Sequence, residues 1–175
     1  MNINDFNDRL TLGIKHEESI RESLRIRGWL AEPFGQAMIS ETMRSHLRKV
    51  DTPVRRLPDI IAAKGLASGE QIIFIEAKGG KRYRETGKHD VELASLESAE
   101  AFIDYSGGRP FYFVFDNGGV ATPEDIREVC WPGYFTGRGS GTPFVLFPVA
   151  ICRSFGSVFG EKPTAINTAT RISQT

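Results

Sequence analysis

The sequence predicts a single α/β domain built on a mixed β-sheet, and three observations support this fold class. The chain has 175 residues, 40% of them hydrophobic, which is the size of one domain with a buried core. Two apolar runs, 60–63 and 71–77, flank a turn that contains glycines and predict a hairpin. A helical pattern over 90–105 then precedes a strand pattern over 110–115, and a helix between two strands is typical of a crossover in an α/β sheet.

The first element is a helix predicted over 12–27. Ile20 and Leu24 lie one helical turn apart, and Glu17, three residues before Ile20, shares their face. Glu17 has two interpretations at this stage. It either forms an ion pair with Arg21, which would stabilise the helix by about 0.3 kcal/mol, or it contributes to a functional site beside the sheet.

A short strand over 29–31 follows, and then a second helix over 37–49, for which Ser40 provides a cap. The other side of this helix and the segment after it are basic. Two interpretations remain open, a solvated surface or a wall that contacts phosphates. The basic residues of this group are Arg44, His46, Arg48, Lys49, Arg55 and Arg56.

The predicted hairpin is the most informative stretch, because each of its strands delivers a carboxylate to the same place. Antiparallel pairing about a turn centred near Ala67 puts Asp59 opposite Glu76. The Cβ atoms of directly opposed residues are about 5 Å apart, so two acidic side chains repel each other there unless a cation or a proton lies between them. Lys78 lies two residues after Glu76 and therefore on the same face, whereas Ala77 points away.

An aspartate, a glutamate and a lysine at one place predict a specific chemistry. Mg²⁺ binds carboxylate oxygens and keeps several of its waters. An adjacent lysine can orient an attacking water or help to deprotonate it. The pattern is typical of metal-dependent phosphodiester hydrolysis, with Asp59 and Glu76 as metal ligands and Lys78 beside the water.

A basic loop follows the second strand of the hairpin and therefore begins at the candidate site. Its cations are candidates for binding a phosphate backbone, and its tyrosine is a candidate stacking surface. These candidates are Lys81, Arg82, Tyr83, Arg84 and Lys88. His89 could act as a general base, but a lone histidine at a predicted helix start is more often a cap or a surface residue.

The remaining elements support the sheet. The helix over 90–105 has an apolar side that can cover a sheet face and an acidic outer side, which a phosphate backbone should avoid. A short helix begins near Thr122, and a last apolar strand spans 143–150. We therefore expect one domain over 1–156 and a polar C-terminal tail over 157–175, which lacks periodicity as partly disordered segments do.

Charge and composition limit the classes of partner. Lys and Arg number 22 and Asp and Glu number 22, so any contact with nucleic acid must use local patches. No apolar run approaches the ~20 residues needed to span a bilayer, and the N-terminus lacks the pattern of a signal peptide. Cys130 and Cys152 lack metal-ligand spacing. These observations predict a cytoplasmic protein with reduced thiols and no membrane partner.

The hairpin residues resemble the PD-(D/E)XK nuclease superfamily. Pro58-Asp59 is similar to the first element of that motif, and Glu76-Ala77-Lys78 is similar to the second. The resemblance implies a restriction-endonuclease-like fold, in which helices flank a mixed central β-sheet. It also implies a Mg²⁺-dependent endonuclease that hydrolyses DNA, with Mn²⁺ able to substitute and with the Ala77 carbonyl as a further metal ligand.

The first helix narrows the resemblance within the superfamily. Glu17 upstream of Gly28-Trp29 is similar to the first-helix glutamate of the archaeal Holliday-junction resolvases. That similarity implies that Glu17 supports the metal or its waters, and it makes junction or branched DNA a candidate substrate. The extra helix over 37–49 departs from the compact resolvase pattern and leaves this subclass open.

A competing hypothesis is a catalytically silent module on the same fold, which binds nucleic acid or takes part in an assembly. Such a module would keep the basic loops that bind nucleic acid but would not cleave it. The sequence also leaves open whether the protein forms a homodimer.

Overall fold

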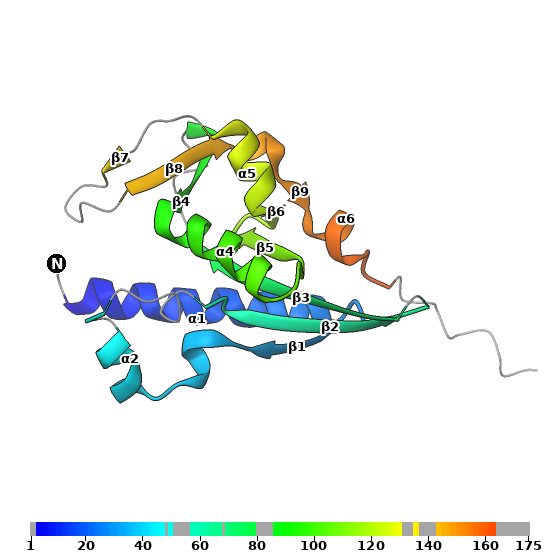
Figure 1. Ribbon diagram of the computed structural model, residues 1–175, viewed down its shortest axis with the longest axis horizontal. Helices are drawn as coiled ribbons and strands as arrows, with labels where there is room; N and C mark the ends of the chain where they lie inside the picture. The colour runs from blue at the N-terminus through cyan, green and yellow to red at the C-terminus, as the bar shows by residue number, and fades with distance from the viewer. Residues whose placement is uncertain are drawn as a thin grey trace, which may run out of the picture.

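A six-stranded mixed sheet with helices on both faces forms the body of the protein (Figure 1). The computed structural model describes residues 3–47, 49–50, 57–67, 69–79, 86–130, 135–136 and 143–163. The strands, in spatial order, are β1 (Leu30–Pro33), β2 (Ile60–Leu66), β3 (Gly69–Lys78), β5 (Phe111–Phe115), β6 (Gly119–Ala121) and β9 (Arg153–Ser154). β3 and β5 are parallel, and the other neighbouring pairs are antiparallel. The mixed α/β sheet predicted from the sequence is confirmed.

The helices divide between the two faces of this sheet. The first face carries α1 (Ile3–Arg25) and α6 (Phe155–Phe159), and the second carries α4 (Leu93–Tyr105) and α5 (Pro123–Val129). Two short helical segments, a 3-10 turn (Gly35–Met38) and α2 (Glu41–Leu47), follow β1 in the chain. α4 connects β3 to the parallel strand β5, which is the crossover that the helical pattern predicted.

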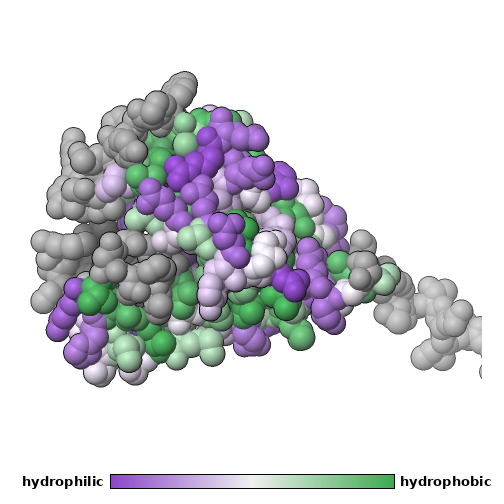
Figure 2. Space-filling model, viewed as in Figure 1, coloured by the Kyte–Doolittle hydropathy of each residue, from purple (hydrophilic) through white to green (hydrophobic). Residues whose placement is uncertain are grey.

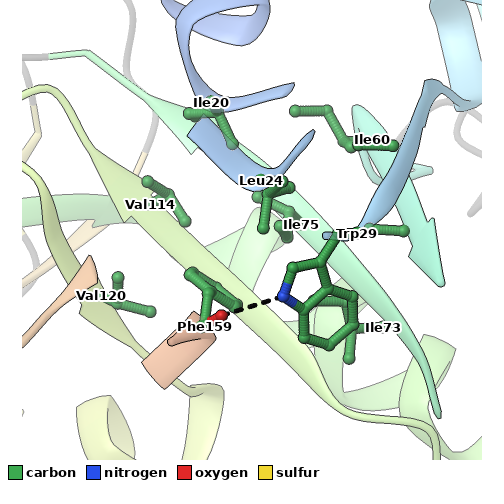
Figure 3. Packing of buried hydrophobic residues seen from close by; sticks show 11 residues of the cluster. Ile20, Leu24, Trp29, Ile60, Ile73, Ile75, Val114, Val120 and Phe159 are labelled. Carbon is green, nitrogen blue, oxygen red and sulfur yellow. Dashed lines mark hydrogen bonds between the residues drawn. The ribbon is translucent and has the colours of Figure 1, made fainter. Parts of the chain in front are cut away.

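The core on the α1 face consists mainly of aliphatic side chains around Trp29 and Phe159 (Figure 3). Ile73 and Ile75 point to this face because side chains alternate along β3. Leu24 of α1 is fully buried there, and burying a leucine stabilises a fold by about 2 kcal/mol. The indole N–H of Trp29 donates to the carbonyl of Phe159 at 3.0 Å and so joins the start of β1 to α6.

The core on the opposite face is rich in phenylalanine. Phe74 of β3 and Phe102 of α4 meet edge to face, with ring centroids 4.7 Å apart. Leu96 and Ala99 are buried on the sheet side of α4, and Phe113 is fully buried beneath them. α4 is therefore fixed to the sheet by its apolar side, as predicted.

A second sheet of three strands corrects the prediction for residues 90–92. These residues belong to β4 (Lys88–Glu92), which pairs with β8 (Pro143–Pro148), and β8 pairs with β7 (Phe135–Thr136). The helix predicted over 90–105 therefore begins at Leu93. His89 and Val91 are buried and alternate with more exposed neighbours, a period of two that the helix-forming residues after them obscured.

The bounds of other elements also differ from those predicted from the sequence. The helix predicted over 12–27 begins earlier, at Ile3, and the one over 37–49 is a 3-10 turn followed by a short α-helix. The tail expected from Ser157 begins inside α6, and Phe159 belongs to the core. β6 and β9 are short strands that the sequence did not reveal. Among the described helices, none is long and apolar enough to cross a membrane.

Candidate active site

Asp59 lies immediately before β2, where the hairpin with β3 begins. The hairpin has the predicted register: Ile60 pairs with Ile75, and continuing the pairing brings Asp59 beside Glu76. The backbone N–H of Asp59 donates to the Ile75 carbonyl at 3.0 Å, and its Oδ2 accepts from the Ala77 N–H at 2.8 Å. Both contacts fix the carboxylate against the end of β3.

The chain that leaves β1 holds the Asp59 backbone from the other side. The N–H of Phe34 donates to the Asp59 carbonyl at 2.7 Å. Gly35 has a φ of +60°, and a Cβ there would lie 2.6 Å from the Pro58 carbonyl oxygen. Only glycine combines this left-handed conformation with so close an approach. This support of Asp59 was not foreseen from the sequence.

Glu76 and Lys78 point to the α4 face of the sheet, because they alternate with the residues that face α1. Lys78 Nζ donates to Glu76 Oε1 at 3.0 Å and to Ser95 Oγ of α4 at 3.3 Å. It also lies 6.0 Å from the centroid of the Phe113 ring. The two charged side chains are 21% (Lys78) and 19% (Glu76) exposed, so their ion pair is only partly screened by water.

Glu17 approaches the same place from α1, which covers the opposite face. Its pKa is raised by burial and by the negative charge of Glu76, and Arg21 partly offsets the shift. Arg21 donates its hydrogen bond to Glu18, so the ion pair with Arg21 that was one interpretation of Glu17 is not the contact formed. Glu17 is therefore an acidic neighbour of the hairpin carboxylates.

The electrostatics of the site centre on Asp59. Burial raises the pKa of Asp59 well above its ordinary value, and the charges of Glu76 and Glu17 raise it further. The Ala77 N–H and the Lys78 ammonium work in the opposite direction without cancelling the effect. Burial would lower the pKa of Lys78, but Glu76 and Asp59 outweigh it, so that pKa is raised. The site is a strained group of carboxylates beside one protonated lysine.

Comparison with solved structures identifies the fold. The Holliday junction resolvase Hjc from the archaeal hyperthermophile Archaeoglobus fulgidus superposes with a TM-score of 0.52 at 13% sequence identity, over 85% of this chain and 96% of that chain. The chain has a restriction-endonuclease-like fold. A nuclease from a fusselovirus also matches, with a TM-score of 0.42 at 11% identity over 91% of both chains. No protein-family model and no curated protein sequence matches the chain.

The resemblance to PD-(D/E)XK nucleases that the hairpin residues suggested is thus confirmed at the level of the fold. Within the restriction-endonuclease-like sheet, Asp59, Glu76 and Lys78 are brought together at one end of the hairpin, and Glu17 reaches them from α1. Their catalytic and metal-binding roles stay predictions.

The oxygen donors at this site suit a hard divalent cation. Mg²⁺ takes one or two carboxylates and keeps waters. A cation would relieve the repulsion from Glu76 and Glu17, which adds to the effect of burial in raising the pKa of Asp59. The N–H and C=O of one strand residue point to the same neighbour, so the Ala77 carbonyl lies on the Asp59 side of β3. In the described part of the chain, however, no three His, Cys, Asp or Glu side chains form a ready-made metal cluster.

The candidate nucleic-acid contacts are mostly outside the described residues. Lys88 lies exposed at the start of β4, and Lys49 lies exposed just after α2. The candidates outside the described residues are Arg48, Arg55, Arg56, Lys81, Arg82, Tyr83 and Arg84.

His89 is buried in β4, and it is neither a helix cap nor a surface residue. Its ring stacks on Phe115, with centroids 4.0 Å apart. Asn117 Oδ1 accepts from the Gly119 N–H, so its Nδ2 faces His89 Nε2, 3.2 Å away, as a donor. Nε2 is therefore an acceptor in a neutral imidazole, and burial lowers the pKa of this group. The lone pair that a general base would need is already used.

Two further residues near the site were missed by sequence reasoning. Ser95 contacts the Lys78 ammonium from α4. His16, next to Glu17 on α1, has Nε2 3.2 Å from the Val114 carbonyl of β5. Neither has a sequence signal of its own, because both contacts join residues that only the packed helices bring together.

Proposed function

We propose that this protein is a metal-dependent nuclease that hydrolyses DNA phosphodiester bonds. The observation that carries the proposal is the convergence of Asp59, Glu76 and Lys78 at the end of the β2–β3 hairpin, with Glu17 coupled to them electrostatically. The restriction-endonuclease-like fold supports it, because the hairpin motif resembles that of nucleases with this fold.

The side chains divide the work. Asp59, Glu76 and the Ala77 carbonyl would hold Mg²⁺, or Mn²⁺ in its place, with Glu17 supporting the ion or its waters. A bound Mg²⁺ would supply Lewis-acid polarisation of the phosphate and a more acidic water. Lys78 keeps its proton at Nζ, since its pKa is raised, and therefore acts as a hydrogen-bond donor that orients the water or a phosphate oxygen.

The substrate class that we infer is DNA, with branched or junction DNA as the first candidate. Hjc is a Holliday junction resolvase. In the sequence, Glu17 resembles the first-helix glutamate of that branch. Basic residues next to the site would bind phosphates independently of sequence. We expect Lys81, Arg82, Arg84 and Lys88 to do so, with Tyr83 as a stacking surface and Arg48, Lys49, Arg55 and Arg56 as a second group.

A catalytically silent module on the same fold is the second candidate. It is favoured by one observation: Lys78 already donates a hydrogen bond to Glu76, which is one of the candidate metal ligands. In that case the protein would bind DNA in the presence of Mg²⁺ without cleaving it.

One experiment separates the two candidates. The protein is incubated with labelled linear, nicked, flapped and four-way DNA, with Mg²⁺, with Mn²⁺ or with a chelator. We expect metal-dependent cleavage that Asp59→Ala, Glu76→Ala and Lys78→Ala each abolish, while DNA binding in Ca²⁺ persists. Binding without cleavage of any substrate in either metal would favour the silent module. Light scattering of the same samples would show whether the protein is a homodimer.

A further inference from the structure

The Lys78 ammonium is held by two acceptors that come from different elements. One is Glu76 on the same strand, at 3.0 Å, and the other is Ser95 on α4, at 3.3 Å. A lysine ammonium has three N–H donors on a long and flexible stem. When two donors are fixed in space, the direction of the third is fixed as well.

Ser95 is attached to a rigid part of the fold. It lies in the first turn of α4, next to Leu96, whose side chain is fully buried against the sheet. Ser98, one turn later, is different, because its hydroxyl donates to the Ala94 carbonyl of its own helix at 2.7 Å. The two serines therefore differ in whether they contact the site.

The two acceptors also differ in what competes for them. Glu76 is a candidate metal ligand, so a cation at the site would compete with Lys78 for the same carboxylate. A neutral serine hydroxyl is a much poorer ligand for Mg²⁺ than a carboxylate. The contact with Ser95 can therefore persist when Glu76 turns toward a cation.

We propose that Ser95 is a positioning residue that fixes the direction of the Lys78 ammonium, and so aligns the proton that Lys78 offers to the water or the phosphate. This inference rests on the proposed nuclease function. Ser95 touches no reacting atom in it and acts only through Lys78.

The kinetic test uses Ser95→Ala with Ser98→Ala as its matched control. Ser95→Ala should lower kcat about tenfold, which is typical when a group that orients a catalytic side chain is lost. KM for DNA should change little, because the phosphate contacts remain. Ser95→Thr keeps the hydroxyl and should restore most of kcat, and Ser98→Ala should match the parent.

A second readout needs neither cleavage nor metal. Lys78 is labelled with an acylating reagent, and the labelling rate is followed by mass spectrometry of its peptide. Acylation requires a neutral amine that can reach the reagent, and the hydrogen bond to Ser95 holds Lys78 as an ammonium against α4. Ser95→Ala should therefore label several-fold faster at Lys78 than the parent, Ser98→Ala or Ser95→Thr. Labelling at the exposed Lys15 should be equal in all four proteins, which shows that they received the same dose of reagent, and equal melting temperatures would show that they are equally folded.

The kinetic and labelling readouts distinguish a failure of the nuclease proposal from a failure of the Ser95 proposal. If the parent cleaves no DNA, the nuclease proposal fails while the labelling still tests the contact between Ser95 and Lys78. Equal labelling of Lys78 in Ser95→Ala and the parent would overturn the positioning role. A full kcat in Ser95→Ala, with the parent active, would overturn it too, even if the labelling rises.

Discussion

The Asp59 carboxylate is held in place by a hydrogen bond, although its surroundings destabilise its negative charge. Its Oδ2 accepts from the Ala77 N–H, but burial and the charges of Glu76 and Glu17 still raise its pKa well above the ordinary value of 3.8. The folded-state pKa is higher than the unfolded one. The stability that this group contributes is therefore complete below pH 3.8 and is lost as the pH rises through the raised pKa.

Asp59→Asn should consequently stabilise the metal-free protein at neutral pH, since an asparagine oxygen can still accept from Ala77. The same change removes a candidate ligand. The parent should gain about 2.7 kcal/mol at a hundredfold excess of Mg²⁺ over Kd, and Asp59→Asn much less. Melting temperatures at several pH values, with Mg²⁺ and with chelator, would measure both effects.

Glu18→Gln is the matched control for this comparison. Glu18 is 52% exposed on α1 and pairs with Arg21 and Arg25, away from the hairpin. Its metal response should equal that of the parent. An equal Mg²⁺ shift in Asp59→Asn would mean that the ion binds elsewhere in the chain.

His89 gives a pH effect of the opposite sign. Burial lowers its pKa below the ordinary 6.5, and this outweighs the nearby charges of Asp116 and Asp90. Its contribution to stability is complete above pH 6.5 and is lost as the pH falls through the lowered pKa. His89→Phe keeps a ring against Phe115 and cannot be protonated. It should flatten the loss of stability below pH 6.5, as measured by urea unfolding at a series of pH values.

His46→Gln serves as the control, because His46 is exposed on α2. Its pH dependence should follow that of the parent. If His89→Phe loses stability on acidification as steeply as the parent, protonation of the buried imidazole does not cause the loss of stability below pH 6.5.

At the scale of elements, the hairpin could be predicted and its supports could not. The register from Ile60 to Leu66 follows from two apolar runs and a glycine turn, all local in sequence. β4 was missed because its last three residues, 90–92, directly precede strong helix formers and were assigned to the helix. The contacts of Gly35 with Pro58 and of Ser95 with Lys78 depend on packing between elements, which no local pattern encodes.

Gly35→Ala tests whether the segment after β1 positions Asp59. A left-handed alanine costs about 1–2 kcal/mol by itself. The added Cβ would also lie 2.6 Å from the Pro58 carbonyl, so the residues before β2 must shift. We expect a larger loss of unfolding free energy and a marked loss of cleavage, measured by urea unfolding and by nuclease assay.

Gly107→Ala isolates the conformational part of this effect. Gly107 has a φ of +75°, and a Cβ there would meet nothing within 4 Å. Gly107→Ala should lose unfolding free energy only by the conformational cost of a left-handed alanine, and it should cleave DNA like the parent. Equal losses of stability and activity in both variants would show that the approach to Pro58 does not matter.

At the scale of the whole molecule, the site depends on both faces of the sheet. Glu17 comes from the face that α1 and α6 cover, whereas Glu76 and Lys78 point to the face that α4 covers. α6 covers the first face and is attached to it by the hydrogen bond from Trp29 to Phe159.

The outer side of α4 is acidic, with Glu97 and Asp104 exposed, and hydrophilic side chains gather over α4 and α5 in Figure 2. DNA should therefore meet the molecule elsewhere.

The salt dependence of DNA binding tests this layout. Since 22 basic and 22 acidic residues balance, long-range attraction is weak and each local phosphate contact should be visible. Each lost contact reduces the slope of log K against log salt by about 0.9. The combined change of Lys81, Arg82 and Arg84 to glutamine should weaken binding and flatten that slope. Fluorescence anisotropy with four-way DNA in Ca²⁺, over a series of salt concentrations, would measure both quantities.

The control changes charge on the surface that DNA should avoid. Glu97→Gln with Asp104→Asn alters the net charge by two units at sites on the outer side of α4. If DNA contacts are local, this variant should keep the slope of the parent and change affinity only slightly, because an exposed charge beyond a Debye length of about 8 Å is screened at physiological salt. A slope that moves in this variant, or a triple variant that binds like the parent at every salt concentration, would place the DNA on a different face.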